Sequence, residues 1–316
     1  MGEVVNNICE LKKEQLIIIN ISKKSQEEIN IYQKLENDLQ LLFSVTEDKE
    51  ILNLIELKNG NLLLLKKHQI KIYDIDKNQM QINKIQEINS PDYPNELYKG
   101  IKELINGYLI SISFYKDKTK DNKIIFLEKK LFNKEYEIIG YIKIKEKPID
   151  ILEVNDKNFL ILFENNNLYM FDSNTGKGEK KFLYKLNNNS PYKRMIQVED
   201  NGILFINLNS IYLLNIKTLL HATAIKRILI NDICYIDNLK NKFLVSYINN
   251  GYYGLLLLNT DLSKNEVYEI KEAINNNLNF GIKCMKLLSD GHIITASNDN
   301  TVKIIKILKK ISDMHQ

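Results

Sequence analysis

The sequence of 316 residues contains no tryptophan, four prolines and only two arginines, Arg194 and Arg227, among its 44 basic residues. Arginine holds phosphates and base edges through a planar fork of donors that lysine cannot reproduce. The formal net charge is only +4, which gives no strongly basic field. We therefore expect the lysines to lie on solvated strand faces, and we expect no nucleic-acid partner.

Cysteines and long apolar runs are also scarce. Cys9, Cys234 and Cys284 are odd in number and include no close pair in the sequence, which argues against a disulfide framework or a zinc site. No apolar stretch approaches the ~20 residues of a membrane span. Met1–Val5 lacks the basic flank and apolar run of a secretion signal. We expect a cytoplasmic protein in a reducing compartment, without a membrane span.

Motifs that carry catalysis are missing. The four histidines, His68, His221, His292 and His315, have no partner at metal-ligand spacing. No serine, cysteine or threonine lies in a nucleophile elbow or beside a recognisable base. The glycines of Gly176–Gly178 fit a hairpin turn better than a phosphate loop. The sequence therefore predicts a protein that is not an enzyme and that needs no metal or cofactor.

A short phrase recurs along the chain: a strand ending in an aliphatic residue, a polar turn, then a second aliphatic strand. Its clearest copy is Leu57–Leu62 and its last is Leu288–Ile293. The aliphatic anchors stand at positions 11, 57, 104, 154, 198 and 288, separated by 46, 47, 50, 44 and 90 residues, and a looser copy at Ile236–Phe243 divides the last gap. A period of about 45 residues with strands in every copy indicates propeller blades rather than helical repeats of about 34.

Each copy holds more than this inner hairpin. In the second copy, the apolar segments Ile51–Leu57 and Leu62–Leu65 are followed by the alternating segment Ile70–Ile75 and the more polar Met80–Ile85. A continuous apolar run indicates burial on both faces, and strict alternation indicates a half-exposed strand. The gradient orders four antiparallel strands from the centre to the rim of a blade.

We therefore predict an all-β, seven-bladed β-propeller of four-stranded antiparallel blades that forms one domain over residues 1–316. The blades span about 1–46, 47–90, 97–145, 147–188, 191–230, 231–272 and 278–311. Two tandem β-sandwiches are the alternative, but a constant period does not favour them. The first copy begins directly with an inner strand at Val4–Leu11. The fourth strand of the last blade must therefore come from Leu308–Gln316 or be missing, or the chain is a piece of a longer polypeptide.

The last repeat carries the turn Ser289–Gly291, the small residues Thr295–Ser297 and the tight turn Asp299–Ile304. In these features it resembles a WD repeat of the eukaryotic β-propeller family. Elsewhere the signature has decayed: Tyr73-Asp74 and Phe171-Asp172 stand where Trp-Asp is expected, and no Gly-His pair precedes an inner strand. The resemblance implies a scaffold for protein–protein contacts, in which Asp299 caps backbone amides of its turn and has a structural role.

Glutamates recur at one repeat position, next to the hairpin anchor, at Glu10, Glu56, Glu103 and Glu153. Carboxylates converging from different blades would suit a propeller hydrolase or lyase that uses the central channel. A ring of equivalent positions instead favours a structural or solvating role. We expect the latter.

The loops between blades, and those between second and third strands, are predicted to open on one face of the propeller. Tyrosine and arginine are typical of interface hot spots, because they bury a large area and keep a polar end. Gathered on one face, such residues predict an interaction surface. The candidates are Tyr93, Tyr98, Tyr115, Tyr192, Lys193, Arg194, Tyr252, Tyr253 and Phe280.

The sequence thus predicts an interaction scaffold, part of a larger complex, that binds a peptide or helix of a partner protein on this aromatic face. Two alternatives stay open. One is the propeller enzyme with channel carboxylates. The other is the interaction domain of a larger regulatory protein, such as a kinase or ubiquitin-ligase subunit.

Overall fold

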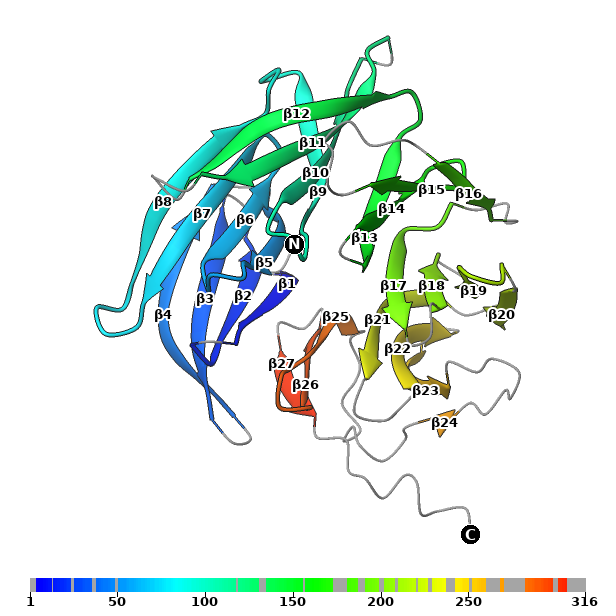
Figure 1. Cartoon of the computed structure of the whole chain (residues 1–316). Coiled ribbons are helices and arrows are strands. Elements are labelled where there is room, and N and C mark those ends of the chain that lie inside the picture. Colours follow the sequence, from blue (N-terminus) through cyan, green and yellow to red (C-terminus); the bar gives the residue numbers. More distant parts are fainter. Residues whose placement is uncertain are drawn as a thin grey trace. The chain divides into compact units, whose positions relative to one another are not determined.

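The computed structural model contains only strands among the residues it describes (Figure 1). The described part of the chain therefore includes no helix that could cross a membrane. The described residues are 4–12, 14–23, 26–35, 38–48, 51–117, 119–130, 135–155, 157–172, 181–186, 191–198, 202–207, 210–219, 221–226, 229–236, 242–249, 252–259, 268–269, 282–297 and 301–305.

Each repeat forms one antiparallel sheet, which we call a blade, with its strands hydrogen-bonded in chain order. Contact clustering divides the chain into two units, and the second unit spans Glu50–Ile225. Its blades 2 and 3 consist of β5 (Ile51–Glu56), β6 (Leu62–Lys66), β7 (Gln69–Asp76) and β8 (Gln81–Asn89), and of β9 (Glu96–Glu103), β10 (Leu109–Tyr115), β11 (Asn122–Lys129) and β12 (Tyr136–Ile144). Blades 4 and 5 consist of β13 (Pro148–Asn155), β14 (Asn158–Phe163), β15 (Asn167–Asp172) and β16 (Lys181–Lys185), and of β17 (Arg194–Val198), β18 (Gly202–Ile206), β19 (Ser210–Asn215) and β20 (His221–Lys226).

The first unit combines both ends of the chain, Met1–Lys49 and Lys226–Gln316. Blade 1 consists of β1 (Val4–Leu11), β2 (Leu16–Ser22), β3 (Glu27–Lys34) and β4 (Leu39–Glu47). Blade 6 consists of β21 (Leu229–Ile236), β22 (Lys242–Asn249), β23 (Tyr252–Asn259) and β24 (Tyr268–Glu269), and blade 7 of β25 (Ile282–Leu287), β26 (Ile293–Ser297) and β27 (Val302–Ile305).

The predicted blade composition needs one correction. The structure shows six four-stranded blades where seven were predicted. The last repeat contributes only three strands among the described residues. The segment Leu308–Gln316, named as a possible source of the fourth strand, lies outside them. The prediction that all repeats form a single domain stays a prediction.

The gradient of burial within a blade is confirmed. In blade 2, every residue of β6 is buried, β7 mixes buried and partly exposed residues, and β8 has no buried residue. Strand β10 shows why the second strands are rich in apolar residues, because its two faces pack against different blades. Leu109 of β10 belongs to a core with β6 and β7, whereas the next residue, Ile110, belongs to a core with β14. Burial of both faces explains why these runs lack the alternation of a half-exposed strand.

In the first unit, the first and last repeats pack against each other. Val5, Ile17 and Ile19 of blade 1 share a core with Leu288 and Ile294 of blade 7. Two segments separated by nearly the whole chain are thus held together by buried apolar area, the main favourable term in folding.

The polar turn of the repeated phrase has one geometry in three blades. Gly60, Gly107 and Gly291 have φ of 91°, 88° and 85°, a region that side-chain-bearing residues rarely adopt. Each of these glycines donates its N–H to the carbonyl of the anchor leucine three residues earlier, at 2.8–3.0 Å. The glycines therefore let the chain reverse directly after the inner strand.

The repeated glutamates bind the turn of the preceding blade. A Glu103 carboxylate oxygen accepts the N–H of Lys58 at 2.7 Å, and a Glu153 oxygen accepts the N–H of Ile105 at 2.5 Å. Glu10 accepts the N–H of Ser289 in the same way, at 2.8 Å. The predicted structural role is confirmed for these three residues, because each satisfies a backbone donor of the neighbouring turn.

Candidate functional site

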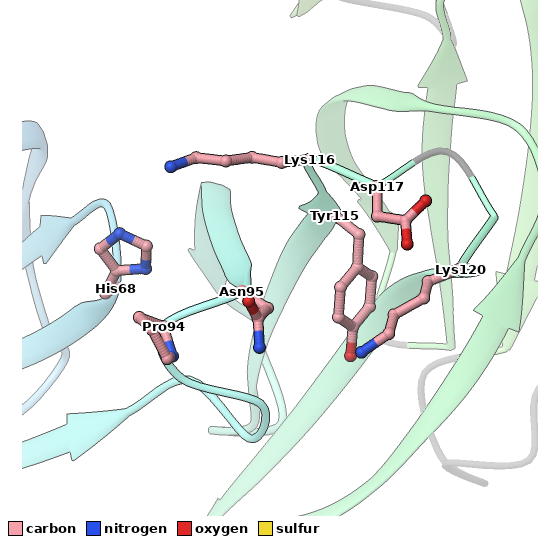
Figure 2. A pocket seen from close by; sticks show the side chains of 7 residues that line it. All are labelled: His68, Pro94, Asn95, Tyr115, Lys116, Asp117 and Lys120. Atoms are coloured by element: carbon pink, nitrogen blue, oxygen red, sulfur yellow. The ribbon is translucent and has the colours of Figure 1, made fainter.

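A depression of about 420 Å³ lies on the second unit, where three connecting segments meet. These are the β6–β7 turn, the link from β8 to β9, and the β10–β11 loop (Figure 2). The sequence predicted that links between blades and loops between second and third strands share one face, and here they line one pocket. The lining residues are His68, Pro94, Asn95, Tyr115, Lys116, Asp117 and Lys120.

Cations surround the ring of Tyr115 on one wall of the pocket. The Nζ atoms of Lys120 and Lys123 lie 5.0 and 5.1 Å from the ring centroid, within the range of cation–π attraction. Lys120 also forms an ion pair of 3.0 Å with Asp92, and its hydrogen bond is the main reason why the pKa of Asp92 lies below its ordinary value. The Tyr115 side chain is 8% exposed, and burial raises the pKa of its hydroxyl.

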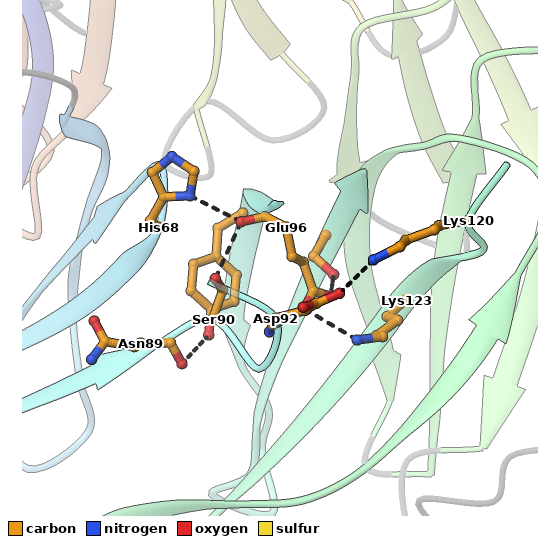
Figure 3. A network of polar contacts seen from close by, with 9 residues as sticks. His68, Asn89, Ser90, Asp92, Glu96, Lys120 and Lys123 are labelled. Carbon is orange, nitrogen blue, oxygen red and sulfur yellow. Dashed lines mark hydrogen bonds and ion pairs between the residues drawn. The ribbon is translucent and has the colours of Figure 1, made fainter. Parts of the chain in front are cut away.

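A buried ion pair supports this wall from below (Figure 3). Glu96 is fully buried, and its carboxylate lies 3.2 Å from Lys123 Nζ. The same carboxylate accepts the Ser113 hydroxyl at 2.5 Å and the Asp92 N–H at 3.2 Å. Burial lowers the pKa of Lys123, but its bonds to Tyr115 and Glu96 outweigh this effect and the pKa is raised. The network ties the link from β8 to β9 to strands β10 and β11.

The opposite wall is formed by His68, which comes from blade 2. Its Nδ1 atom lies 3.0 Å from the carbonyl oxygen of Glu96. A carbonyl can only accept, so Nδ1 is the donor of this bond and Nε2 is left to accept a hydrogen bond. The ring of Tyr93 packs edge-on against His68, with centroids 5.5 Å apart. Tyr93 is 60% exposed. The rim of the pocket therefore presents an aromatic ring that is held by its contact with His68.

The expectation that the candidate tyrosines are exposed is wrong for three of them. Tyr98 and Tyr192 are 1% and 2% exposed, and Tyr115 is only slightly more accessible. The Tyr98 hydroxyl donates to the carbonyl of Asn89 at 3.3 Å, which satisfies its polar end inside the core. The Tyr192 ring lies 5.9 Å from that of Phe205 in the core of blades 4 and 5. Tyrosine gains more from packing both its ring and its hydroxyl than from exposing them.

Lys193 and Arg194 are exposed but lie elsewhere. Arg194 begins β17 and lines a second depression of about 500 Å³, together with Lys102, Glu153 and Gln197. Phe280 and Asp299 lie outside the described residues, as do the side chains of Tyr252 and Tyr253, whose backbone belongs to β23. Among the predicted contact residues whose side chains the structure describes, Tyr115 lines the first pocket and Tyr93 packs against its lining residue His68.

The sequence patterns did not mark His68 or Lys120 as contact residues. They also did not mark Glu96 and Lys123, the buried ion pair that supports the pocket. Glu96 occupies the first position of an inner strand, where a buried carboxylate is unexpected unless a cation lies nearby. Lys123 directly precedes the apolar run Ile124–Leu127 of the third strand β11. Two opposite charges in such positions could have indicated a buried ion pair between Glu96 and Lys123. Among the described residues, no cluster of histidine, cysteine, aspartate and glutamate could hold a metal ion.

Repeated four-stranded antiparallel sheets, with buried second strands and turns bonded to a neighbouring blade, are the units from which a β-propeller is built. Solved structures support this class over almost the whole chain. The chain is similar to a chain in the crystal structure of the mitotic checkpoint complex, with a TM-score of 0.68, 12% identity, and 96% of this chain and 87% of that chain covered. It is also similar to Sqt1 of Saccharomyces cerevisiae, with a TM-score of 0.66, 8% identity and 97% of each chain covered.

A third similar structure is the C-terminal WD40 domain of Sif2, with a TM-score of 0.64, 11% identity, and 96% of that chain and 97% of this one covered. At these identities the likeness concerns the fold alone. No protein-family model and no curated protein matches the sequence. The chain is therefore a β-propeller with the WD40-type fold, as the last repeat indicated.

Proposed function

We propose that the chain is a non-enzymatic interaction scaffold that binds a peptide or helix of a partner protein at the pocket lined by His68 and Tyr115. The observation that carries this proposal is the combination of an exposed aromatic rim with a recessed polar floor: Tyr93 is 60% exposed beside a depression of about 420 Å³. Exposed aromatic residues next to a pocket are typical anchors of protein interfaces.

The frame of the pocket is suited to this task because it is held before any partner binds. The Ser90 N–H donates to the carbonyl of His68 at 2.8 Å, and the Tyr98 N–H donates to that of Lys67 at 2.7 Å. With the Glu96–Lys123 pair, these bonds fix all three segments that form the walls. Little ordering entropy is then lost on binding, which favours affinity.

The enzymatic alternative gains no support from the carboxylates that suggested it. Glu10, Glu103 and Glu153 each accept backbone N–H groups of a neighbouring turn. These bonds explain why glutamate recurs at this repeat position without assigning it a catalytic role. We further propose that the chain acts in the cytoplasm as part of a larger complex.

The test is quantitative affinity capture from the source cells with three forms of the purified chain: wild type, Tyr93→Ser and Ile85→Ser. Ile85 lies on the outer strand β8 and is 44% exposed, so its replacement is a matched control for loss of an exposed apolar side chain. We expect Tyr93→Ser to reduce captured partners at least about fivefold and Ile85→Ser to leave them unchanged. Equal capture by all three forms would rule out this pocket as the binding site.

A further inference from the structure

The pocket described above carries an uneven set of charges. Its lining includes the charged side chains of Lys116, Asp117 and Lys120 and the imidazole ring of His68. Asp117 is occupied within its own loop, because its carboxylate accepts the Thr119 N–H at 2.9 Å and this bond holds the pKa of Asp117 below its ordinary value. Lys120 is held by Asp92 at 3.0 Å. Asp92 does not itself line the pocket, but it offsets the charge of Lys120, so the remaining lining cation is Lys116.

Lys116 differs from Lys120, the other lining cation, which is paired with Asp92. Lys116 is exposed, and no hydrogen bond or ion pair joins it to any residue in the described ranges. Figure 2 shows its side chain extended along the mouth of the pocket, in the direction of His68. An ammonium group at the mouth of a pocket attracts anions most strongly once a bound segment excludes water, because the local dielectric constant then falls.

The wall formed by Tyr115 is a poor site for a bound cation. Tyr115 already has two ammonium groups near its ring, those of Lys120 and Lys123 at 5.0 and 5.1 Å. A third cation would have to share the ring with these two groups. The Asn95 amide can donate two N–H bonds, whereas the Tyr115 hydroxyl is already hydrogen-bonded to Asp92.

We infer that the pocket receives an anionic side chain of the bound partner segment, either a carboxylate or a phosphoryl group. Lys116 supplies the charge that contacts it, and the Asn95 amide can donate to it. His68 closes the far side of the pocket. This inference rests on the proposed function and adds to it the chemical class of the recognised residue.

The experiment measures fluorescence anisotropy of the purified chain with four labelled heptapeptide pools, random except for the central residue. The central residue is glutamate, phosphoserine, glutamine or lysine. We expect the glutamate or the phosphoserine pool to bind at least about fivefold more tightly than the glutamine and lysine pools. Whichever of these two pools binds more tightly shows whether the pocket prefers a carboxylate or a phosphoryl group.

Two variants assign the effect to the pocket. Lys116→Gln should remove most of the preference for the anionic pools, whereas Lys143→Gln, at an exposed position of the outer strand β12, should keep it. Both residues are exposed, so we expect unchanged thermal unfolding for both variants. A preference that survives Lys116→Gln would contradict the inference.

Failure of the inference and failure of the proposed function give different results. If all four pools bind equally and Tyr93→Ser weakens each of them, the pocket binds peptides without selecting an anion, and only the inference is overturned. A preference for lysine also overturns it. If no pool binds and Tyr93→Ser leaves partner capture unchanged, both fail.

Discussion

The carboxylate of Glu103 in blade 3 accepts the backbone N–H of Lys58 in blade 2 at 2.7 Å, while Lys58 Nζ donates back to the carbonyl of Leu104 at the same distance. Lys58 of blade 2 is thus bonded to blade 3 through both its backbone and its side chain. Burial raises the pKa of Glu103, against the opposing effects of Lys58 and Tyr136. Because the Glu103 carboxylate accepts the Lys58 N–H although burial disfavours its charge, we assign it a structural role that links the two blades.

Removing this link should destabilise the fold. Glu103→Ala leaves the Lys58 N–H without its acceptor, so we expect the free energy of unfolding in urea to fall by about 1.5–3 kcal/mol. Glu103→Gln keeps an acceptor oxygen and should cost less than the alanine substitution. Glu137→Ala is the control: its side chain is 57% exposed and lies 3.7 Å from Lys130, so its effect should stay within about 0.5 kcal/mol. Equal losses for Glu103→Ala and Glu137→Ala would contradict this role.

The Glu96–Lys123 pair under the pocket predicts strong coupling in a double-mutant cycle. Lys123→Met removes the cation next to a fully buried carboxylate and should cost about 3–5 kcal/mol of stability. Adding Glu96→Gln removes the unpaired charge, so the double variant should be more stable than the sum of the single losses predicts. Urea unfolding of all four forms gives the coupling energy. Additive losses would show that the two charges do not depend on each other.

Asp150 predicts a pH dependence of stability in the weakly acidic range. Its two carboxylate oxygens accept the N–H groups of Ile151 at 2.9 Å and Met195 at 2.6 Å. Burial raises the pKa of Asp150 from 3.8 to about 6, against these bonds and the charges of Arg194 and Lys102. The folded state then holds the proton more tightly than the unfolded state between about pH 4 and 6. The resulting stabilisation is present below pH 4 and is lost as pH rises through 6.

The variant Asp150→Asn cannot titrate, which isolates this effect. On lowering the pH from 7 to 4, wild type should gain stability relative to the variant by at most about 3 kcal/mol, since one pKa unit corresponds to about 1.4 kcal/mol. Urea unfolding of both forms across this range provides the measurement. Parallel pH profiles would show that Asp150 titrates normally.

The turn glycines predict a backbone effect that is separate from packing. Gly107 has a φ of +88°, and a Cβ atom there would meet nothing within 4 Å. Gly107→Ala should therefore cost about 1–2 kcal/mol through conformation alone. Gly140 has equally free space without a positive φ, so Gly140→Ala should be neutral or slightly stabilising. Thermal unfolding of the two variants tests this contrast, and equal effects would mean that the turn geometry carries no cost.

The repeat could be predicted from the sequence because second strands such as β6 are buried along their whole length. That burial requires apolar runs such as Leu62–Leu65 and a glycine turn before them, and both features are local in the sequence. The exposure of tyrosines was not predictable in this way. Tyr93 and Tyr98 lie five residues apart in the same stretch, yet one is exposed and the other is buried. The difference arises from a hydrogen bond to Asn89 and a neighbouring blade, which no local pattern encodes.

The pocket illustrates the same limit. His68, Tyr115 and Lys120 come from different blades or loops, and only the packing of blade 2 against blade 3 brings them together. Their sequence neighbourhoods contain no motif. Strand order predicts that these loops open on the same face of the blades. It does not predict which side chains on that face come into contact.

The measurement that bears most closely on the binding proposal is site-specific photo-crosslinking in the source cells. The photoreactive residue benzoylphenylalanine replaces Tyr93 in one form of the chain and Ile85 in another. We expect a defined crosslinked partner from position 93, reduced by Lys116→Gln in the same chain, and no comparable product from position 85. Equal products from both positions, or none from position 93 while partners are still captured, would contradict binding at this pocket.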